Sequence, residues 1–296
     1  MFKKKKNRSY IDSNTLNPTH FSFGQLKIYA YLLPIAIVML LPIIFIFVDA
    51  LKPLDELFAY PPRFYVKNPT LQNFKNLFNA TSTSNIPASR YLFNTLISTS
   101  AVMLGTIALS VVTGYVLSKK RFKYRELLFT INTVALMFVP IAVQIPRYFI
   151  IVFLGLKNSF WSNIIPLLIS PTCVFLVKQF IDQLPDALIE AAVIDGANDW
   201  VIIKKIIVPL VKPTIATVAI VTFQIAWGST EASTLYLDGE ANRTFMYYIS
   251  TITSASAIDG RGMSAASSLI MFLPNLIFFI AMQSKVMNTM VNSGIK

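Results

Sequence analysis

The sequence is poor in the residues that disulfides, metal sites and hydrolytic enzymes require. Cys173 and His20 are each the only residue of their kind, so the chain cannot form an internal disulfide or a zinc site built from cysteine and histidine. His20 lies in a polar N-terminal segment, so it is poorly placed to form a Ser–His–Asp catalytic triad. The ten glycines include no G-x-x-x-x-G-K-[ST] phosphate-binding loop. We therefore expect this chain to bind no metal or cofactor and to catalyse no reaction by itself.

Charged residues are also scarce, and their scarcity indicates a membrane protein. Only 14% of the residues are charged, whereas 54% are hydrophobic and the mean hydropathy is +0.58. A soluble domain usually carries about 25% charged residues, and apolar runs of about 20 residues match a hydrocarbon core about 30 Å thick. The sequence has no basic stripe interleaved with aromatic residues, so its net charge of +12 predicts no nucleic-acid partner.

The apolar runs predict an all-α, polytopic membrane protein with six transmembrane helices. The membrane domain covers residues 28–284, between a basic tail of residues 1–27 and a C-terminal tail of residues 285–296. Most lysines and arginines lie in the two tails and in two of the segments between spans, so the positive-inside rule places these parts, and both termini, on the cytoplasmic side of the cell membrane. The outer loops are then residues 51–91 and 236–262. The predicted spans are 28–50, 91–117, 127–156, 161–180, 214–235 and 263–282.

A polar insert at residues 183–213 separates the fourth and fifth predicted spans. It contains the segments EAAVIDGANDW (190–200) and KKIIVPLVKP (204–213). Helical spacing predicts a short helix, a turn at Gly196 in the left-handed conformation, and a second helix that ends at Pro209. From the residues alone, this pair of helices could lie on the inner leaflet, held by its lysines and anionic lipid, or project from the bilayer to dock on a soluble partner.

The pattern E-A-A-x-x-D-G-A-x-x-W in this insert resembles the EAA coupling loop of the membrane subunits of binding-protein-dependent ABC importers. The segments DALKPLDELFAYPP and GYVLSKKRFKYRELLF are similar to segments of maltose-type carbohydrate permeases. The chain thus resembles the smaller, six-span permease subunit of that family. In the family, the loop inserts into a cleft of the ATP-binding subunit. The positions that the resemblance assigns to ATPase coupling are Glu190, Ala191, Ala192, Asp195, Gly196, Ala197 and Pro209.

The resemblance also implies a role for several of these side chains. Glu190 is expected to contact a basic group of the ATP-binding subunit, and Asp195 and Gly196 to fix the bend between the two helices. Ala192 and Ala197 are expected to pack into the cleft of that subunit.

The same resemblance implies the partners of the chain. They are a second permease subunit, two copies of an ATP-binding subunit that carry ATP and magnesium, an extracellular solute-binding protein, and a carbohydrate substrate in a path surrounded by membrane lipid. An ABC permease for an amino acid, a polyamine or an ion stays open as an alternative, because the EAA pattern alone does not determine the substrate.

Arg147 and Glu231 are the charged residues that stand out within the predicted spans. An arginine at the centre of a membrane helix costs about 2.5–3.5 kcal/mol on insertion scales, so it should face water or a partner. Each residue could contact the substrate or form an ion pair near a subunit interface. A secondary transporter or channel that uses the two residues as a gated polar pair is the alternative of a different class. The other candidates for a translocation path are Tyr148, Gln224, Trp227 and Ser229.

Overall fold

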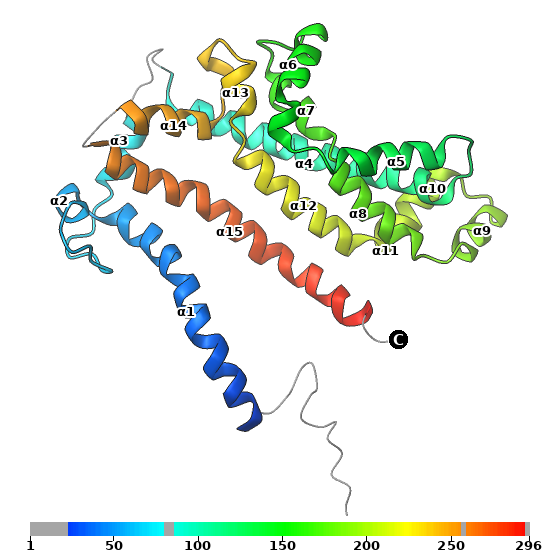
Figure 1. Ribbon diagram of the computed structural model, residues 1–296, viewed down its shortest axis with the longest axis horizontal. Coiled ribbons are helices and arrows are strands. Elements are labelled where there is room, and N and C mark those ends of the chain that lie inside the picture. Colours follow the sequence, from blue (N-terminus) through cyan, green and yellow to red (C-terminus); the bar gives the residue numbers. More distant parts are fainter. Residues whose placement is uncertain (1–22, 80–85, 256–258, 294–296) are drawn as a thin grey trace, which may run out of the picture.

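The structure, a computed structural model, describes residues 23–79, 86–255 and 259–293 (Figure 1). Every element in these ranges is a helix, so the predicted all-α class is confirmed. Within the described residues, four helices are long and apolar enough to cross a membrane, and two pairs of helices bent at a short break bring the number to six if each pair is one span. The four candidates that count as single spans are Leu26–Leu51, Ala88–Lys119, Phe160–Asp182 and Gly260–Gln283, and the bent pairs are Arg125–Ala135 with Pro140–Phe153 and Asp199–Leu210 with Lys212–Leu235.

The helix α4 (Ala88–Lys119) runs along the length of the molecule, and helices from most parts of the chain pack against it (Figure 1). It contacts α8 (Pro171–Asp182) and α12 (Lys212–Trp227), and α12 in turn contacts α15 (Asp259–Ser293). Because α15 continues to Ser293, the predicted C-terminal tail that starts at residue 285 is helical over most of its length.

The helix α1 (Phe23–Leu51) packs on the rest of the molecule mainly through α15 (Figure 1). Its most apolar stretch contains no buried residue, and Tyr31 and Met39 are 72% and 70% exposed. A helix that is apolar on every side and exposed along its length suits a lipid environment. The helix begins at Phe23, before the predicted residue 28, while the remainder of the predicted tail, residues 1–22, lies outside the described ranges.

The predicted third span, residues 127–156, is broken into two helices. It consists of α5 (Arg125–Ala135), a 3₁₀ turn η1 (Pro140–Val143) and α6 (Gln144–Phe153), and its two halves are bent by 110°. Proline lacks an amide hydrogen and disfavours the helical conformation in the residue before it, so Pro140 starts a new helix instead of continuing α5.

The fourth and fifth predicted spans are also interrupted. Residues 161–180 form η2 (Phe160–Asn163), α7 (Ile165–Leu168) and α8, with extended backbone at Ile169 and Ser170. The fifth span, predicted as residues 214–235, ends as α12 at Trp227 and resumes as α13 (Glu231–Leu235).

The two predicted outer loops are partly helical and lie at one end of the molecule (Figure 1). Residues 51–91 contain α2 (Leu54–Leu57) and α3 (Gln72–Asn79), and residues 236–262 contain η4 (Glu240–Asn242) and α14 (Phe245–Ala255). The opposite end carries α5, α9 (Ala187–Ile194) and α10 (Asp199–Ile202).

Packing between α4 and α8 yields a first prediction, at Gly114. A Cβ at this position lies 2.9 Å from Cγ1 of Val177 and 3.2 Å from the backbone nitrogen of Lys178. Glycine to alanine in a helix normally stabilises it by about 1 kcal/mol, whereas overpacking costs about 1–3 kcal/mol. We expect Gly114→Ala to lower the thermal unfolding temperature of the protein in detergent. Gly239→Ala is the control, because no atom lies within 4 Å of its added Cβ; an unchanged or raised unfolding temperature for Gly114→Ala would contradict the prediction.

Candidate functional site

The breaks in three predicted spans meet around one cavity of about 430 Å³. The cavity is lined by Pro140 and Arg147 from η1 and α6, by the junction of α7 with α8, and by the junction of α12 with α13. Each break frees backbone N–H and C=O groups, which hydrocarbon cannot hydrogen-bond. Such breaks are tolerated at membrane depth only where they are buried in protein or line a cavity, and discontinuous helices mark the substrate sites of many transporters.

The lining of this cavity combines apolar side chains with hydroxyl groups. The apolar part includes Val102, Ile169 and Ile225, while the polar part consists of Arg147, Ser170, Thr222, Ser229, Thr230 and Glu231. A second cavity of about 600 Å³, lined mostly by apolar residues, shares Pro140, Arg147, Pro166, Ile169 and Pro171 with the first. Arg147 therefore borders both spaces.

Arg147 and Glu231 form an ion pair with each other. Nη1 of Arg147 lies 3.0 Å and 2.9 Å from the two carboxylate oxygens of Glu231, and the Tyr236 hydroxyl donates a hydrogen bond of 2.8 Å to Oε1. The two side chains are 28% and 26% exposed. The two charges neutralise each other within one chain. This pairing lowers the free-energy cost that a single charge would have inside a membrane.

The structure separates the other predicted path residues into two groups. Ser229 lines the cavity. Trp227 does not: its side chain is 2% exposed, and its Nε1 donates a hydrogen bond of 3.1 Å to the carbonyl of Met271 in α15. Tyr148 packs against Tyr236, with ring centroids 6.2 Å apart, and Gln224 is exposed outside the cavity lining. Trp227 joins α12 to α15, and the path roles of Trp227, Tyr148 and Gln224 stay predictions.

Sequence reasoning missed Ser170, Thr222 and Thr230. Ser170 precedes Pro171, and Thr230 follows Gly228 and Ser229, so the proline and glycine that interrupt these helices were the available signal. Thr222 lies inside α12 and carries no such signal.

The coupling segment, residues 183–213, has the predicted bend at Gly196. Its φ of 80° lies in the left-handed region, where glycine has no steric cost. The side chain of Asn198 then accepts a hydrogen bond of 2.9 Å from the backbone N–H of Val201 and caps α10. The second helix does not end at Pro209: a π-helical turn, Ile203–Ile207, leads into α11 (Val208–Leu210), so Pro209 lies within the helical path. Wider π turns accommodate such local defects in a helix.

One part of the predicted coupling surface belongs to the core of this chain. Ala192 is 9% exposed and packs with Ile202 and Ile207 against α4 and α8, and Ala197 borders the same cluster. Their small size serves packing within the chain, and the expected packing into a partner's cleft stays a prediction. The exposed surface of α9 instead carries Glu190 and Ala191, with Ile194 85% exposed and Trp200 of α10 71% exposed.

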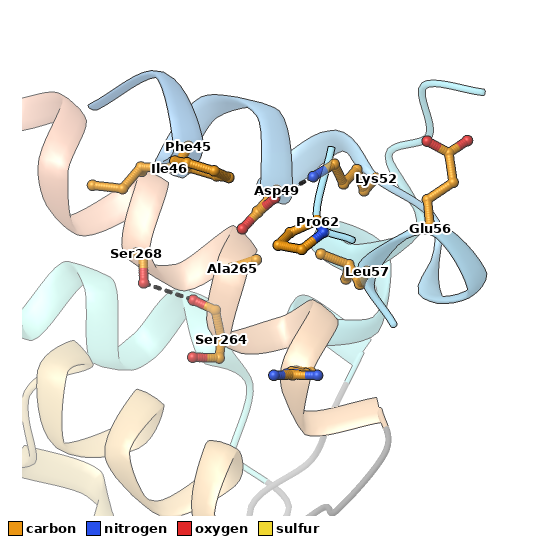
Figure 2. Close-up of a pocket in the computed structure, with 11 residues that line it drawn as sticks. Phe45, Ile46, Asp49, Lys52, Glu56, Leu57, Pro62, Ser264, Ala265 and Ser268 are labelled. Atoms are coloured by element: carbon orange, nitrogen blue, oxygen red, sulfur yellow. Dashed lines mark hydrogen bonds and ion pairs between the residues drawn. The ribbon is translucent and has the colours of Figure 1, made fainter. Parts of the chain in front are cut away.

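The opposite end of the molecule contains a further cavity of about 360 Å³ between α1, α2 and α15 (Figure 2). Asp49 and Lys52 point toward one another in this view, and their charged atoms lie 2.7 Å apart. Glu56 points away and accepts hydrogen bonds of 2.9 Å from the backbone N–H groups of Lys67 and Asn68, and these bonds, the first above all, lower the pKa of its carboxyl group. These contacts fold residues 51–72 into a defined surface.

Comparison with protein families decides the class of this protein. Residues 106–284 match the family described as "Binding-protein-dependent transport system inner membrane component". The chain belongs to this family. It is a membrane permease subunit of an ABC importer, and the matched residues include the coupling segment and all of the cavity lining except Val102. The predicted resemblance is thus confirmed at the level of the family.

Curated relatives extend the match over most of the permease. The chain is 29% identical over 259 residues to "sn-glycerol-3-phosphate transport system permease protein UgpE" of Escherichia coli O1:K1 / APEC. The aligned region covers 86% of this chain and 92% of the relative. It is 27% identical over 278 residues to "Inner membrane ABC transporter permease protein YcjP" of Escherichia coli (strain K12), covering 93% and 98%.

A solved structure supports the fold of the permease. A chain in a bacterial ABC transporter "involved in the import of the acidic polysaccharide alginate" superposes with a TM-score of 0.74 at 20% identity, over 90% of this chain and 98% of that chain. At this identity the similarity concerns the fold.

The ion pair yields the second prediction. Replacing Arg147 with Met leaves Glu231 partly buried without its cation, and an unsatisfied buried group costs about 1–3 kcal/mol. We expect Arg147→Met and Glu231→Gln each to lower the stability of the purified permease, and the double variant to lose less than the sum of the two. Lys157→Met is the control, since its pair with Asp238 is 39% and 65% exposed and contributes little. Strictly additive losses in thermal unfolding would show that the two residues are not coupled.

Proposed function

We propose that this permease forms one wall of a path for a hydroxyl-rich solute of the carbohydrate class. The observation that carries the proposal is the cavity at the meeting point of three helix breaks, with the hydroxyl groups in its lining. Ser170, Ser229 and Thr230 contribute hydroxyl groups to the lining, and the Thr222 hydroxyl, which donates to the carbonyl of Val218, can still accept a hydrogen bond. Apolar side chains complete the lining, as the apolar faces of a sugar ring require. Because Arg147 and Glu231 neutralise each other, the cavity carries no uncompensated charge.

The comparisons agree with this substrate class without fixing the compound. One curated relative is a permease for sn-glycerol-3-phosphate, a phosphorylated polyol, and the similar solved structure imports an acidic polysaccharide. Both solutes carry hydroxyl groups, two in glycerol phosphate and many in the polysaccharide. An ABC permease for a non-sugar solute, such as a polyol phosphate, is the second outcome that the substrate test distinguishes.

A second permease subunit is proposed to complete the wall of the cavity. Ile169 and Ile225, which line it, are 76% and 53% exposed in the single chain. Apolar side chains at the rim of a polar cavity are expected to pack against a neighbouring subunit. A related solved structure contains a periplasmic protein with bound alginate pentasaccharide, which supports an extracellular solute-binding protein as a further partner at the α2–α14 end.

The coupling segment is proposed to dock on an ATP-binding subunit that carries ATP and magnesium. Its exposed face presents Glu190 as the charged group and Ile194 and Trp200 as apolar anchors. We propose on this basis that the α9–α10 end faces the cytoplasm, and both chain termini are proposed to lie on the same side of the membrane. Two such ATP-binding subunits would drive the permease between inward- and outward-facing states.

The secondary transporter or channel that uses the Arg147–Glu231 pair receives less support. The pair is present in the structure, but the chain belongs to a family of binding-protein-dependent transport components. Uptake that continues after removal of the ATP-binding subunit would favour it.

The coupling role yields the third prediction, at Gly196. No atom lies within 4 Å of a Cβ added there, so the Cβ of a valine at this position meets no steric clash. The positive φ of residue 196 instead costs a valine about 1–2 kcal/mol of backbone strain, which disturbs the bend. We expect this variant to insert into the membrane normally. Less ATP-binding subunit should co-purify with it in gentle detergent, and most solute uptake should be lost. Gly155→Val is a matched control, because Gly155 has a φ of 67° and open space but lies in the turn after α6. Equal effects of the two variants would argue that strain alone, and not docking, explains the loss.

The cavity yields the fourth prediction. Removing one hydroxyl group that bonds the substrate costs about 0.5–1.5 kcal/mol, or about 2–10-fold in affinity. We expect Ser229→Ala and Thr230→Val to raise the KM for uptake by that factor, while Gln224→Ala, outside the lining, leaves it unchanged. The substrate is identified by screening neutral sugars, acidic sugars and glycerol phosphate for stimulation of ATP hydrolysis by the purified complex. A KM that none of the lining variants changes would show that the cavity is not on the path.

A further inference from the structure

Three consecutive residues at the end of α4 bind three separate points around the coupling segment. The first, Ser118, donates a hydrogen bond of 2.6 Å to Oδ1 of Asp182, the last residue of α8. Lys178 holds the other oxygen of the same carboxylate at 2.7 Å. This contact fixes α4 to the point where the coupling segment begins.

The second residue, Lys119, binds the start of α9. Its Nζ donates hydrogen bonds of 2.6 Å to the carbonyl of Leu184 and to Oδ1 of Asp186, which directly precedes the helix. The Lys119 side chain is only 7% exposed, so its ammonium group is largely removed from water and depends on these acceptors. Its hydrogen bond is also the main cause of the lowered pKa of the Asp186 carboxyl group.

The third residue, Lys120, binds on the far side of the Gly196 bend. Its Nζ lies 2.6 Å from Oδ1 of Asp199, the first residue of α10, and the Tyr115 hydroxyl donates a hydrogen bond of 3.0 Å to the same oxygen. The hydrogen bond to Asp199 raises the pKa of Lys120. With that pKa raised and the Asp186 pKa lowered, Lys120 and Asp186 keep their charges across the neutral pH range.

The other end of α4 is joined to the opposite end of the molecule. Asn94 donates hydrogen bonds of 2.8 Å and 3.0 Å to the carbonyls of Ala241 and Arg243, and Tyr91 donates one of 2.6 Å to Glu240. The backbone N–H of Phe245 donates to the Thr95 hydroxyl at 2.8 Å. One continuous helix therefore connects the coupling segment with the η4–α14 region (Figure 1).

We propose that Ser118, Lys119 and Lys120 form a latch that makes α4 and the coupling segment move as one body. Three attachments, to Asp182, Asp186 and Asp199, hold the coupling segment at separate points along its length. The apolar cluster beneath them, which includes Tyr115, Ile202 and Ile207, resists separation. α4 then acts as the strut that carries a displacement of α9 to the η4–α14 region. This inference rests on the proposed docking of the coupling segment on an ATP-binding subunit. Lys119 and Lys120 are positioning residues in it.

The first test removes the two lysines of the latch and keeps the fold. Lys119→Met/Lys120→Met retains the apolar stems of both side chains, so the packing beneath them is preserved. In the purified full complex, we expect the ATP-binding subunits to remain bound and ATP hydrolysis to continue, while solute moved per ATP falls at least 10-fold. Lys123→Met is the matched control, because it also removes a lysine next to α4. The ammonium group of Lys123 lies over the ring of Tyr124 instead of a residue of the coupling segment. Partial recovery of coupling in the charge-swapped Lys119→Glu/Asp186→Lys variant would support the ion pair itself.

The second test asks whether the latch stays closed during transport. Cysteines replace Lys120 and Asp199 in a Cys173→Ala background, and a short bifunctional thiol reagent joins them in the purified complex. The double-cysteine variant lacks the Lys120–Asp199 pair, so we expect its coupling to be low before cross-linking and to recover after it, because the two elements move together. Loss of transport on cross-linking would overturn the proposal, since the latch would then have to open in each cycle.

The outcomes separate the latch from the docking proposal. If the unmodified permease retains no ATP-binding subunit, docking fails and the latch fails with it. If docking holds and Lys119→Met/Lys120→Met transports with normal coupling, the latch alone is wrong. If that variant loses its ATP-binding subunits while Lys123→Met keeps them, the lysines belong to the docking surface, and the strut is also wrong.

Discussion

The structure depends above all on the need to satisfy backbone hydrogen bonds in a solvent that offers none. Hydrocarbon permits continuous helices, and irregular backbone survives in it only where protein or water replaces the missing partners. Pro140, Pro171 and the segment after Trp227 interrupt three spans, and all three interruptions face the same cavity. The breaks that weaken the spans as membrane helices thus create the polar interior that a permease requires.

A second constraint is the close packing around α4. Gly114 brings α8 within direct backbone contact, and the buried cluster from Val111 to Val218 joins α4, α8, α12 and the coupling segment. The charged and hydroxyl side chains at the end of α4 continue this contact beyond the apolar cluster, to Asp182, Asp186 and Asp199. The same helix is therefore the centre of the membrane domain and the support of the coupling segment.

The Arg147–Glu231 pair illustrates how a costly group can become part of a site. Each charge alone would be strongly unfavourable at membrane depth, yet together with the Tyr236 hydroxyl they form a neutral, hydrogen-bonded group beside the cavity. The pair also connects α6 to α13, the two short helices that follow the breaks at Pro140 and Trp227.

The sequence by itself determined the all-α class, the family, the approximate spans and the bend at Gly196, because hydropathy, charge placement and glycine conformation are local properties. It did not determine where Ala192, Trp227 or Tyr148 would lie, since a small or aromatic residue at helical spacing suits a core and a binding surface equally well. Only the tertiary structure paired Arg147 with Glu231, 84 positions apart, and gathered the three helix breaks around one cavity. These decisions depend on which helices become neighbours, and that choice is made by packing over the whole membrane domain.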